Sequence, residues 1–288
     1  RAGAQKVGTC RYNFLLNDDG GVVDYIIVYR LADDEFMIVV NAGTQDGDAD
    51  YIRARLPDAV AFANESAQTA KIDLQGPLAL DVMAGLGFDR DALPRYFRAQ
   101  QTELDGMPAL LSRTGYTGEC GFEFYVGAEY ARDAWELLLA QPQVKPAGLG
   151  ARDTLRLEMA YPLYGHELDT ETTPVEAGFK SMLHFKNERP FPGRDKLLAA
   201  PARELVGLRL AGRRAARADA PVRDQAGNEI GRVTSGSFAP SLGVAIALAY
   251  VPAGRVSTGD TLRVGPEKRA LDAEVCDLPF YTEGSARQ

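Results

Sequence analysis

The sequence predicts an α+β region followed by a separate small β-barrel. Segments with strand-like and helix-like patterns alternate from the N-terminus to about residue 200. Near Pro201 the pattern changes to short strands, beginning with ELVGLRL and separated by the turn signals DQAGNE, SGSFAPSLG and PAGRVSTGD. The length of 288 residues is sufficient for two domains with cores of their own. We therefore expect one domain over residues 1–200 and another over residues 201–288.

Three strands rich in β-branched residues are expected first. Residues 11–17 (RYNFLLN) have the pattern of a strand, and DDGG supplies the chemistry of a hairpin turn. The second strand is VVDYIIVYRL, which the turn ADDE separates from the third strand, FMIVVNA. Together these segments predict an antiparallel meander.

The segment TQDGDADYIRARL has two interpretations. Asp46, Asp48 and Asp50 resemble the start of a calcium-binding loop. Tyr51, however, stands where such a loop needs glycine, and Pro57 stands where it needs the closing glutamate. We therefore predict a helix whose first turn carries acidic residues.

The rest of the first region follows the same local rules. Pro77, at the start of an apolar run, suits a first helical position, and Pro162 is expected to stop a later helix. In order, we expect a strand, turn and helix in KIDLQGPLALDVMAGLG, a hairpin in ALLSRTGYTGECGFEFYV, an amphipathic helix in EYARDAWELLLA, and a glycine-rich loop leading into a helix in KPAGLGARDTLRLEMAYPL.

Composition narrows the class of function. The net charge is −8, with 32 Lys and Arg against 40 Asp and Glu, so general nucleic-acid binding is not expected. The three cysteines are far apart in sequence and suggest no disulfide framework, which favours a reduced, cytoplasmic compartment. No apolar run has the length of a membrane span, and no signal peptide is evident.

Metal and nucleotide motifs are not evident either. His166 and His184 do not have the spacing of a zinc site. GLGARD, residues 148–153, lacks the third glycine of a dinucleotide fingerprint, and the sequence contains no Walker A motif. We therefore expect neither a metal nor a nucleotide cofactor.

Glu123 is the most informative of the candidate ligand contacts, because it falls in the middle of the predicted strand GFEFYV. A buried carboxylate is costly unless it has a cation or a ligand with paired N–H donors. Arg152, just before a predicted helix, could be that cation or could bind an anionic ligand tail. Each candidate taken alone is typical of a structural residue. The candidates are Tyr12, Tyr29, Asn41, Tyr116, Glu123 and Arg152.

Five ordered motifs resemble those of the glycine cleavage T-protein family, the aminomethyltransferases. They are LQGPLA, SRTGYTGECGFEFYV, GLGARDTLRLEMAYPLYGHELD, TTPVEAGF and GRVTSGSFAPSLGVAIALAYV. The resemblance covers nearly the whole chain and implies α+β lobes around a central folate-binding channel with a small C-terminal barrel. Family members usually carry a further N-terminal segment that helps to line the folate site, and we expect that this chain lacks it.

The resemblance also implies a reaction and a site. An enzyme of this family takes the aminomethyl group from the lipoyl arm of a carrier protein, releases ammonia and leaves 5,10-methylenetetrahydrofolate. Its co-substrate is tetrahydrofolate, and no metal is required. By motif position, Glu123 would accept the pterin N–H donors, and the other contacts would be Tyr12, Tyr29, Asn41, Tyr116 and Arg152.

The catalytic position departs from the family pattern. Family members usually read Gly-Gly-x-x-Asp-Asp and use the second Asp, but this sequence reads GGVVDY. Asp24 is therefore the candidate catalytic carboxylate, although the family position is occupied by Tyr25. Because side chains alternate along a strand, Asp24 and Tyr25 should point to opposite faces unless a β-bulge re-aims Asp24.

This departure leaves three functional hypotheses. Retention of the other motifs favours an aminomethyltransferase of the glycine cleavage system. The change at Tyr25 also allows a folate-dependent demethylase or a non-catalytic folate-binding relative. We expect folate binding to survive the change better than turnover, because a tyrosine is neutral near pH 7.

Overall fold

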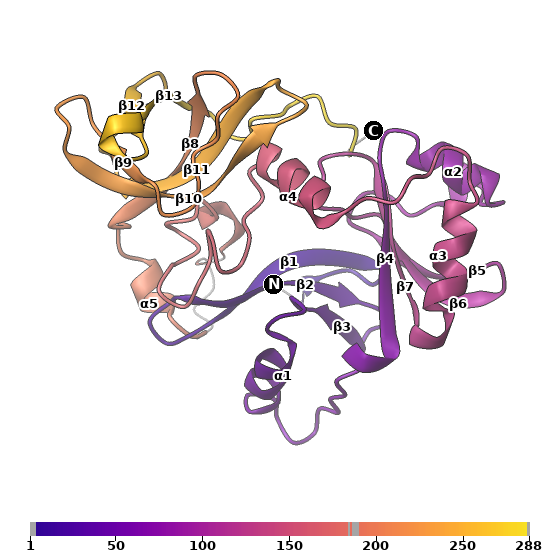
Figure 1. The fold of residues 1–288 in the computed structure, drawn as a ribbon. Coiled ribbons are helices and arrows are strands. Elements are labelled where there is room, and N and C mark those ends of the chain that lie inside the picture. Colours follow the sequence, from indigo (N-terminus) through magenta and orange to yellow (C-terminus); the bar gives the residue numbers. More distant parts are fainter. Residues whose placement is uncertain (1–3, 184, 186–189, 287–288) are drawn as a thin grey trace. The chain divides into compact units, whose positions relative to one another are not determined.

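The computed structural model describes residues 4–183, 185 and 190–286. These residues form two compact units, and neither unit is one continuous stretch of chain (Figure 1). Of the described residues, the first unit contains 4–13, 26–148 and 284–286, and the second contains 14–25 and those between 149 and 283. The predicted boundary near residue 200 stays a prediction.

Three strands form the predicted N-terminal meander. They are β1 (Thr9–Leu16), β2 (Val22–Arg30) and β3 (Phe36–Val39), in the sheet order β1-β2-β3. β2 and β3 are antiparallel, with Tyr29 opposite Met37. The strand β3 ends at Val39, so Asn41 lies just beyond it and not inside the strand as the sequence suggested.

A helix follows the meander. This helix is α1 (Gln45–Arg53), and Asp46 and Asp48 lie in its first turn. The carboxylates interact favourably there with the positive end of the helix dipole. The interpretation of TQDGDAD as the start of a helix is confirmed.

A four-stranded antiparallel sheet is the centre of the first unit. Its order is β4 (Thr69–Gln75), β7 (Gly121–Gly127), β6 (Met107–Ser112) and β5 (Ala99–Leu104). The predicted hairpin over residues 109–126 corresponds to β6 and β7. β4 leads through a short turn into α2 (Ala79–Gly85), which begins two residues after Pro77, so Pro77 is not the first helical residue.

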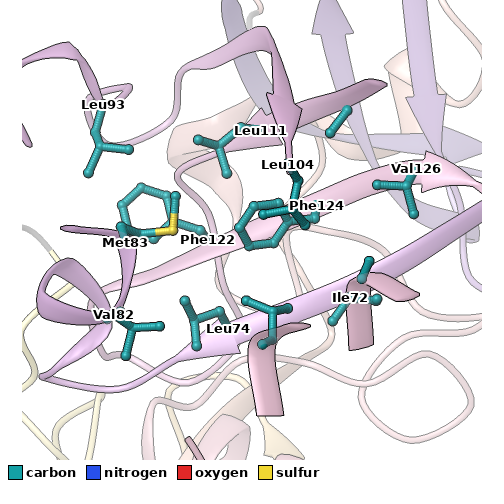
Figure 2. Packing of buried hydrophobic residues seen from close by; sticks show 14 of the residues in the cluster. Ile72, Leu74, Val82, Met83, Leu93, Leu104, Leu111, Phe122, Phe124 and Val126 are labelled. Atoms are coloured by element: carbon teal, nitrogen blue, oxygen red, sulfur yellow. The ribbon is translucent and has the colours of Figure 1, made fainter. Parts of the chain in front are cut away.

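One face of this sheet is apolar. Phe122 and Phe124 are fully buried there and pack with Leu74 and Met83 (Figure 2). Helix α3 (Ala131–Leu139) adds Ala134 to the same core. Alternation along the strands turns the neighbouring residues to the opposite face, where the polar residues are found.

The second unit contains the predicted barrel. Six strands close it in the order β10-β11-β8-β13-β12-β9. The strands are β8 (Arg203–Leu210), β9 (Pro221–Arg223), β10 (Glu229–Ala239), β11 (Val244–Pro252), β12 (Thr261–Val264) and β13 (Leu271–Cys276). Residues such as Leu208, Val222 and Ala247 fill its interior. The predicted α+β fold with a C-terminal barrel is confirmed.

Two helices accompany the barrel in the second unit. They are α4 (Leu149–Glu158) and α5 (Arg194–Leu197). Leu157 of α4 packs against Ile246 and Leu248 of β11. Helix α4 ends before Pro162, as expected from the sequence. Short 3-10 turns occur at Ser66–Gln68, Arg90–Ala92, Ala128–Tyr130, Lys180–Met182 and Glu267–Arg269.

Candidate functional site

A buried carboxylate lies at the centre of the polar face of the four-stranded sheet. Glu123 is 3% exposed and stands in β7 between Asp73 of β4 and Ser112 of β6. Its neighbours Phe122 and Phe124 point into the apolar core on the other face. The predicted position of Glu123, in mid-strand and away from bulk water, is confirmed.

The two oxygens of this carboxylate have different partners. Oε1 lies 2.9 Å from Nζ of Lys71, and Oε2 accepts a hydrogen bond of 2.8 Å from the Tyr125 hydroxyl. The Tyr29 hydroxyl lies 3.5 Å from Oε2. Of the two groups that the sequence suggested for a buried Glu123, a cation or a ligand, the structure supplies the cation. It is Lys71 that contacts the carboxylate.

Hydroxyl groups continue the network away from Glu123. The hydroxyls of Tyr29 and Tyr125 are 3.1 Å apart, and the Tyr29 hydroxyl also donates to Oγ of Ser112 at 3.1 Å. Ser112 Oγ lies 2.8 Å from the Thr114 hydroxyl. Burial and the charge of Glu123 raise the pKa values of Tyr29 and Tyr125 well above that of an ordinary tyrosine. Both phenols therefore remain neutral donors.

Lys71 joins Glu123 to a second acid. Its Nζ lies 2.9 Å from Oδ1 of Asp73 as well as 2.9 Å from the Glu123 carboxylate. Burial lowers the pKa of Lys71, but the charges of Glu123 and Asp73 more than offset this and raise it overall. The Lys71 side chain is 29% exposed, so part of it lies at the surface of this otherwise buried site.

Apolar side chains enclose the hydroxyl end of the network. Tyr29 and Tyr125 pack edge to face, with ring centroids 5.7 Å apart, and contact a small core that includes Cys10 and Leu110. Burial raises the pKa of the Cys10 thiol to about 12, so this cysteine is not a thiolate near neutral pH. A catalytic role for Cys10 is therefore not supported.

The loop between β6 and β7 carries Tyr116 and is held closely by Gln75. The Gln75 amide donates to the carbonyl of Thr114 at 3.0 Å and accepts from the Thr117 hydroxyl at 3.0 Å. A side chain at Gly115 or Gly121 would collide with this amide, which explains why glycine suits both positions.

The C-terminal segment of the described chain also holds this loop. Ser285 Oγ accepts a hydrogen bond from the Cys120 N–H at 2.9 Å, and Ala286 N–H donates to the Gly118 carbonyl at 3.1 Å. The loop between β6 and β7 is thus held by Gln75 of β4 and by Ser285 and Ala286.

Four of the six predicted ligand contacts lie on different strands, loops or helices of the structure. They are Tyr12, Asn41, Tyr116 and Arg152. Tyr12 lies on β1, half-buried and edge-on to Phe97 with ring centroids 5.5 Å apart. Asn41 and Tyr116 are half-buried in loops of the same unit. Arg152 is exposed in the first turn of α4, in the second unit, whereas the sequence suggested a position just before the helix.

The structure brings Tyr29 and Glu123 into the same network. The proposed convergence of the remaining candidates on that network stays a prediction.

Asp24 and Tyr25 belong to the second unit and differ in environment. Asp24 is 0% exposed, and the residues of β2 alternate between buried and half-buried from Val22 to Val28, as expected for a regular strand. Tyr25 stacks on Phe14 with ring centroids 5.2 Å apart and lies 6.0 Å from the Phe179 ring. Tyr25 is thus part of an aromatic cluster.

Sequence reasoning missed most of the partners of Glu123. Lys71 and Tyr125 were not among the candidates, although period-2 alternation carries a signal for them. In β4, Lys71 and Asp73 alternate with the core residues Ile72 and Leu74. When charged and apolar residues alternate along a strand, the charged residues share one face of the sheet. This pattern indicates that each charge has a partner on that face.

The part of the chain that the structure describes contains no group of three or more His, Cys, Asp or Glu side chains able to hold a metal ion. Nδ1 of His166 lies 3.1 Å from the Thr234 carbonyl. His184 lies outside the described residues. Among residues 4–183, 185 and 190–286, no helix combines the length and apolar character needed to cross a bilayer.

The fold and the site together define a class of protein. It is an α+β protein with a closed C-terminal barrel, and it carries a buried, cation-paired carboxylate surrounded by phenols on one sheet face. Family models match both parts in the same order. The GCVT N-terminal domain matches residues 1–187, and the glycine cleavage T-protein C-terminal barrel domain matches residues 203–282. The chain belongs to the glycine cleavage T-protein family.

Individual relatives agree with this assignment. An aminomethyltransferase of Cutibacterium acnes is 41% identical, over 95% of this chain and 77% of the relative. One of Moorella thermoacetica is 45% identical, over 94% of this chain and 75% of the relative. The crystal structure of glycine cleavage system aminomethyltransferase T from Bartonella henselae matches with a TM-score of 0.88 and 32% identity, covering 98% of this chain and 79% of that one.

Proposed function

We propose that the chain is an aminomethyltransferase of the glycine cleavage system. It would move the aminomethyl carbon from the lipoyl arm of a carrier protein to tetrahydrofolate and release ammonia. Family membership over both domains supports the reaction class. The single structural observation that carries the proposal is the buried Glu123 carboxylate, which is paired with Lys71 and bonded by Tyr125.

The chemistry of this carboxylate fits the edge of a pterin ring. Adjacent N–H donors on the ring match a charged carboxylate, which has about four acceptor positions on its two oxygens. The hydrogen bond from Tyr125 and the ion pair with Lys71 occupy one position on each oxygen. Acceptor capacity therefore remains on both oxygens for a ligand.

The remaining folate contacts are proposed from motif position. Tyr12, Tyr29 and Tyr116 supply flat aromatic sides for a ring system, and Asn41 supplies an amide. Arg152 is exposed, which suits a contact with the anionic glutamate end of folate.

Tetrahydrofolate would supply the amine nucleophile that attacks the lipoyl-bound aminomethyl carbon. The protein would hold the reactants close and aligned, an effect worth roughly 7–11 kcal/mol in favourable cases. A carboxylate near the reacting centre would stabilise a developing positive charge. Asp24 is the proposed carboxylate, because Tyr25 is a phenol packed against Phe14. Since β2 alternates regularly through these residues, this role requires the face of β2 opposite Tyr25 to line the reacting centre.

The experiment measures binding and turnover separately. Calorimetry gives the affinity for tetrahydrofolate, and a steady-state assay with an aminomethyl-loaded lipoyl carrier gives the rate of ammonia release. We expect Glu123→Gln to weaken folate binding roughly tenfold or more, since a neutral amide accepts fewer N–H donors. Unchanged affinity in this variant would remove Glu123 from the folate site.

The turnover assay decides among the related functions. Ammonia release that depends on both the lipoyl carrier and tetrahydrofolate would support the proposal. Folate binding without ammonia release would identify a non-catalytic folate-binding protein. Activity with a methylated amine donor, but none with the lipoyl carrier, would identify a folate-dependent demethylase.

A further inference from the structure

An ammonium group bridges two carboxylates on the polar face of the four-stranded sheet. Nζ of Lys71 lies 2.9 Å from Glu123 and 2.9 Å from Asp73. The two acids face each other directly in the register of β4 and β7. Like charges directly opposite on neighbouring strands repel each other, and Lys71 offsets that repulsion.

The two oxygens of Glu123 are held from two different strands. Lys71 reaches Oε1 from β4, while Tyr125 donates to Oε2 from β7 itself, two residues further along the strand. A carboxylate with a different fixed donor on each oxygen cannot rotate freely about its last bond. Lys71 and Tyr125 therefore set the plane in which Glu123 presents its remaining acceptor positions.

The other groups around Glu123 do not duplicate the role of Lys71. Tyr29 from β2, Tyr125 from β7 and Ser112 from β6 are neutral hydroxyls, and Cys10 from β1 is a thiol. Asp73 carries the same charge as Glu123. Within the described residues, Lys71 is the cation in contact with this carboxylate.

We propose that Lys71 is a positioning residue for folate recognition, because it fixes the direction in which the Glu123 carboxylate faces the pterin edge. This inference rests on the proposed function of Glu123. A lysine that only stabilised the fold would affect unfolding alone. A positioning lysine also determines ligand affinity in protein that remains folded.

The test compares a substitution that removes the cation and its hydrogen-bond donor with one that keeps both. Lys71→Met removes both and should weaken tetrahydrofolate binding roughly 10- to 100-fold, as expected when a charge-assisted contact is lost. Lys71→Arg keeps a cation with several donors and should restore affinity to within about threefold of wild type, since a threefold change is under about 1 kcal/mol. Affinity is measured by calorimetry on protein shown to be folded by urea titration.

A charge-balanced variant covers the case in which Lys71→Met does not fold. Lys71→Met/Asp73→Asn removes one positive and one negative charge, so the site keeps the wild-type net charge. This variant should fold and still bind tetrahydrofolate roughly tenfold more weakly than wild type, because the donor to Oε1 is gone. Wild-type affinity in this double variant would overturn the positioning role.

An exposed ion pair in the same unit is the matched control. Arg132 and Glu136 on α3 are 2.8 Å apart and both are well exposed. Arg132→Met should leave folate affinity unchanged, because the pair is not part of the Glu123 network. Loss of affinity in Arg132→Met equal to that in Lys71→Met would show that any lost cation weakens binding, which would also overturn the proposal.

The result also distinguishes this inference from the proposed function. If Glu123→Gln binds tetrahydrofolate as wild type does, the folate role of Glu123 fails. If Glu123→Gln weakens binding while folded Lys71→Met does not, Glu123 remains a ligand contact and Lys71 is only structural.

Discussion

Two buried glutamates, one in each compact unit, show how differently the same group can be used. Glu123 in the first unit is paired with Lys71, whose side chain is 29% exposed. Glu167 in the second unit is 0% exposed and is paired at 3.0 Å with Arg156, which is 2% exposed. Both pairs neutralise a buried charge, but only the pair at Glu123 extends to solvent.

The surroundings of the two pairs explain the contrast. Arg156 also donates to Asp153 at 2.7 Å and to Ser235 at 2.9 Å, and Glu167 accepts from the Leu163 N–H at 3.0 Å. The guanidinium fork of Arg156 thus ties α4 to the loop before residue 170 and to β10. Lys71, in contrast, contributes a single point charge between two acids. We infer that the Arg156 pair is structural and that the Lys71 pair leaves acceptor capacity for a ligand.

The strongest test of this contrast is Arg156→Met. It would leave Glu167 buried without its cation, and breaking such a pair costs about 3–5 kcal/mol. The free energy of unfolding, measured by urea titration of the whole chain, should fall by that amount. Arg156→Lys keeps a charge and should lose less. A loss below about 1 kcal/mol for Arg156→Met would contradict the structural role, because that is the range of an exposed pair.

Removing the Tyr125 hydroxyl should lower the free energy of unfolding by less than Arg156→Met does. Tyr125→Phe removes the 2.8 Å hydrogen bond to Glu123 and the 3.1 Å contact with Tyr29. We expect a decrease of about 1–3 kcal/mol in the free energy of unfolding, as for a lost hydrogen bond to a buried charge. Tyr130→Phe is the control, because Tyr130 packs at the edge of the apolar core. Equal effects of the two changes would argue against a special role for the Tyr125 hydroxyl.

The smallest expected effect is a pH dependence from Cys10. Burial raises the pKa of this thiol from 9.0 to about 12. Because the unfolded chain loses this proton first as pH rises, the thiol favours folding below pH 9 and loses that contribution between about pH 9 and 12.

Cys10→Ala should therefore show a flatter decline of stability in this range than wild type does. Between about pH 8 and pH 10 the two proteins should differ by about 1.4 kcal/mol in total, because the unfolded thiol titrates around pH 9.0. Unfolding free energies measured at about pH 8, 9 and 10 would show this difference. The tyrosines are the same in both proteins, so their titration cancels in the comparison. Parallel declines in the two proteins would show that Cys10 titrates equally in both states.

Local sequence predicted most of the fold because its determinants are local. Alternating apolar residues and turn signals identified the meander, the hairpin of β6 and β7, and the barrel strands. The acids of α1 were correctly assigned to a first helical turn. The exact ends were less predictable, as at Pro77 and Asn41, because tertiary contacts decide where an element stops.

The candidate site was only partly predictable for a related reason. Glu123 was identified because an acid in mid-strand needs a partner, which is a local argument. Its partner Lys71 lies about fifty residues earlier in the chain, and only the register of β4 against β7 brings them together. Arg152 was suggested either as the cation or as a contact for an anionic ligand tail, whereas the cation on Glu123 is Lys71, which lies outside the five motifs.

The discontinuous course of the chain has a consequence for its integrity under proteolysis. Residues 284–286 return to the first unit, where Ser285 and Ala286 bond to the loop that carries Tyr116. Residues 14–25 likewise belong to the second unit, where Leu16 and Val22 pack with Leu197. A nick near residue 200 would therefore cut the backbone but would leave each unit composed of pieces from both fragments. Such fragments should remain together after cleavage and should separate only in denaturant.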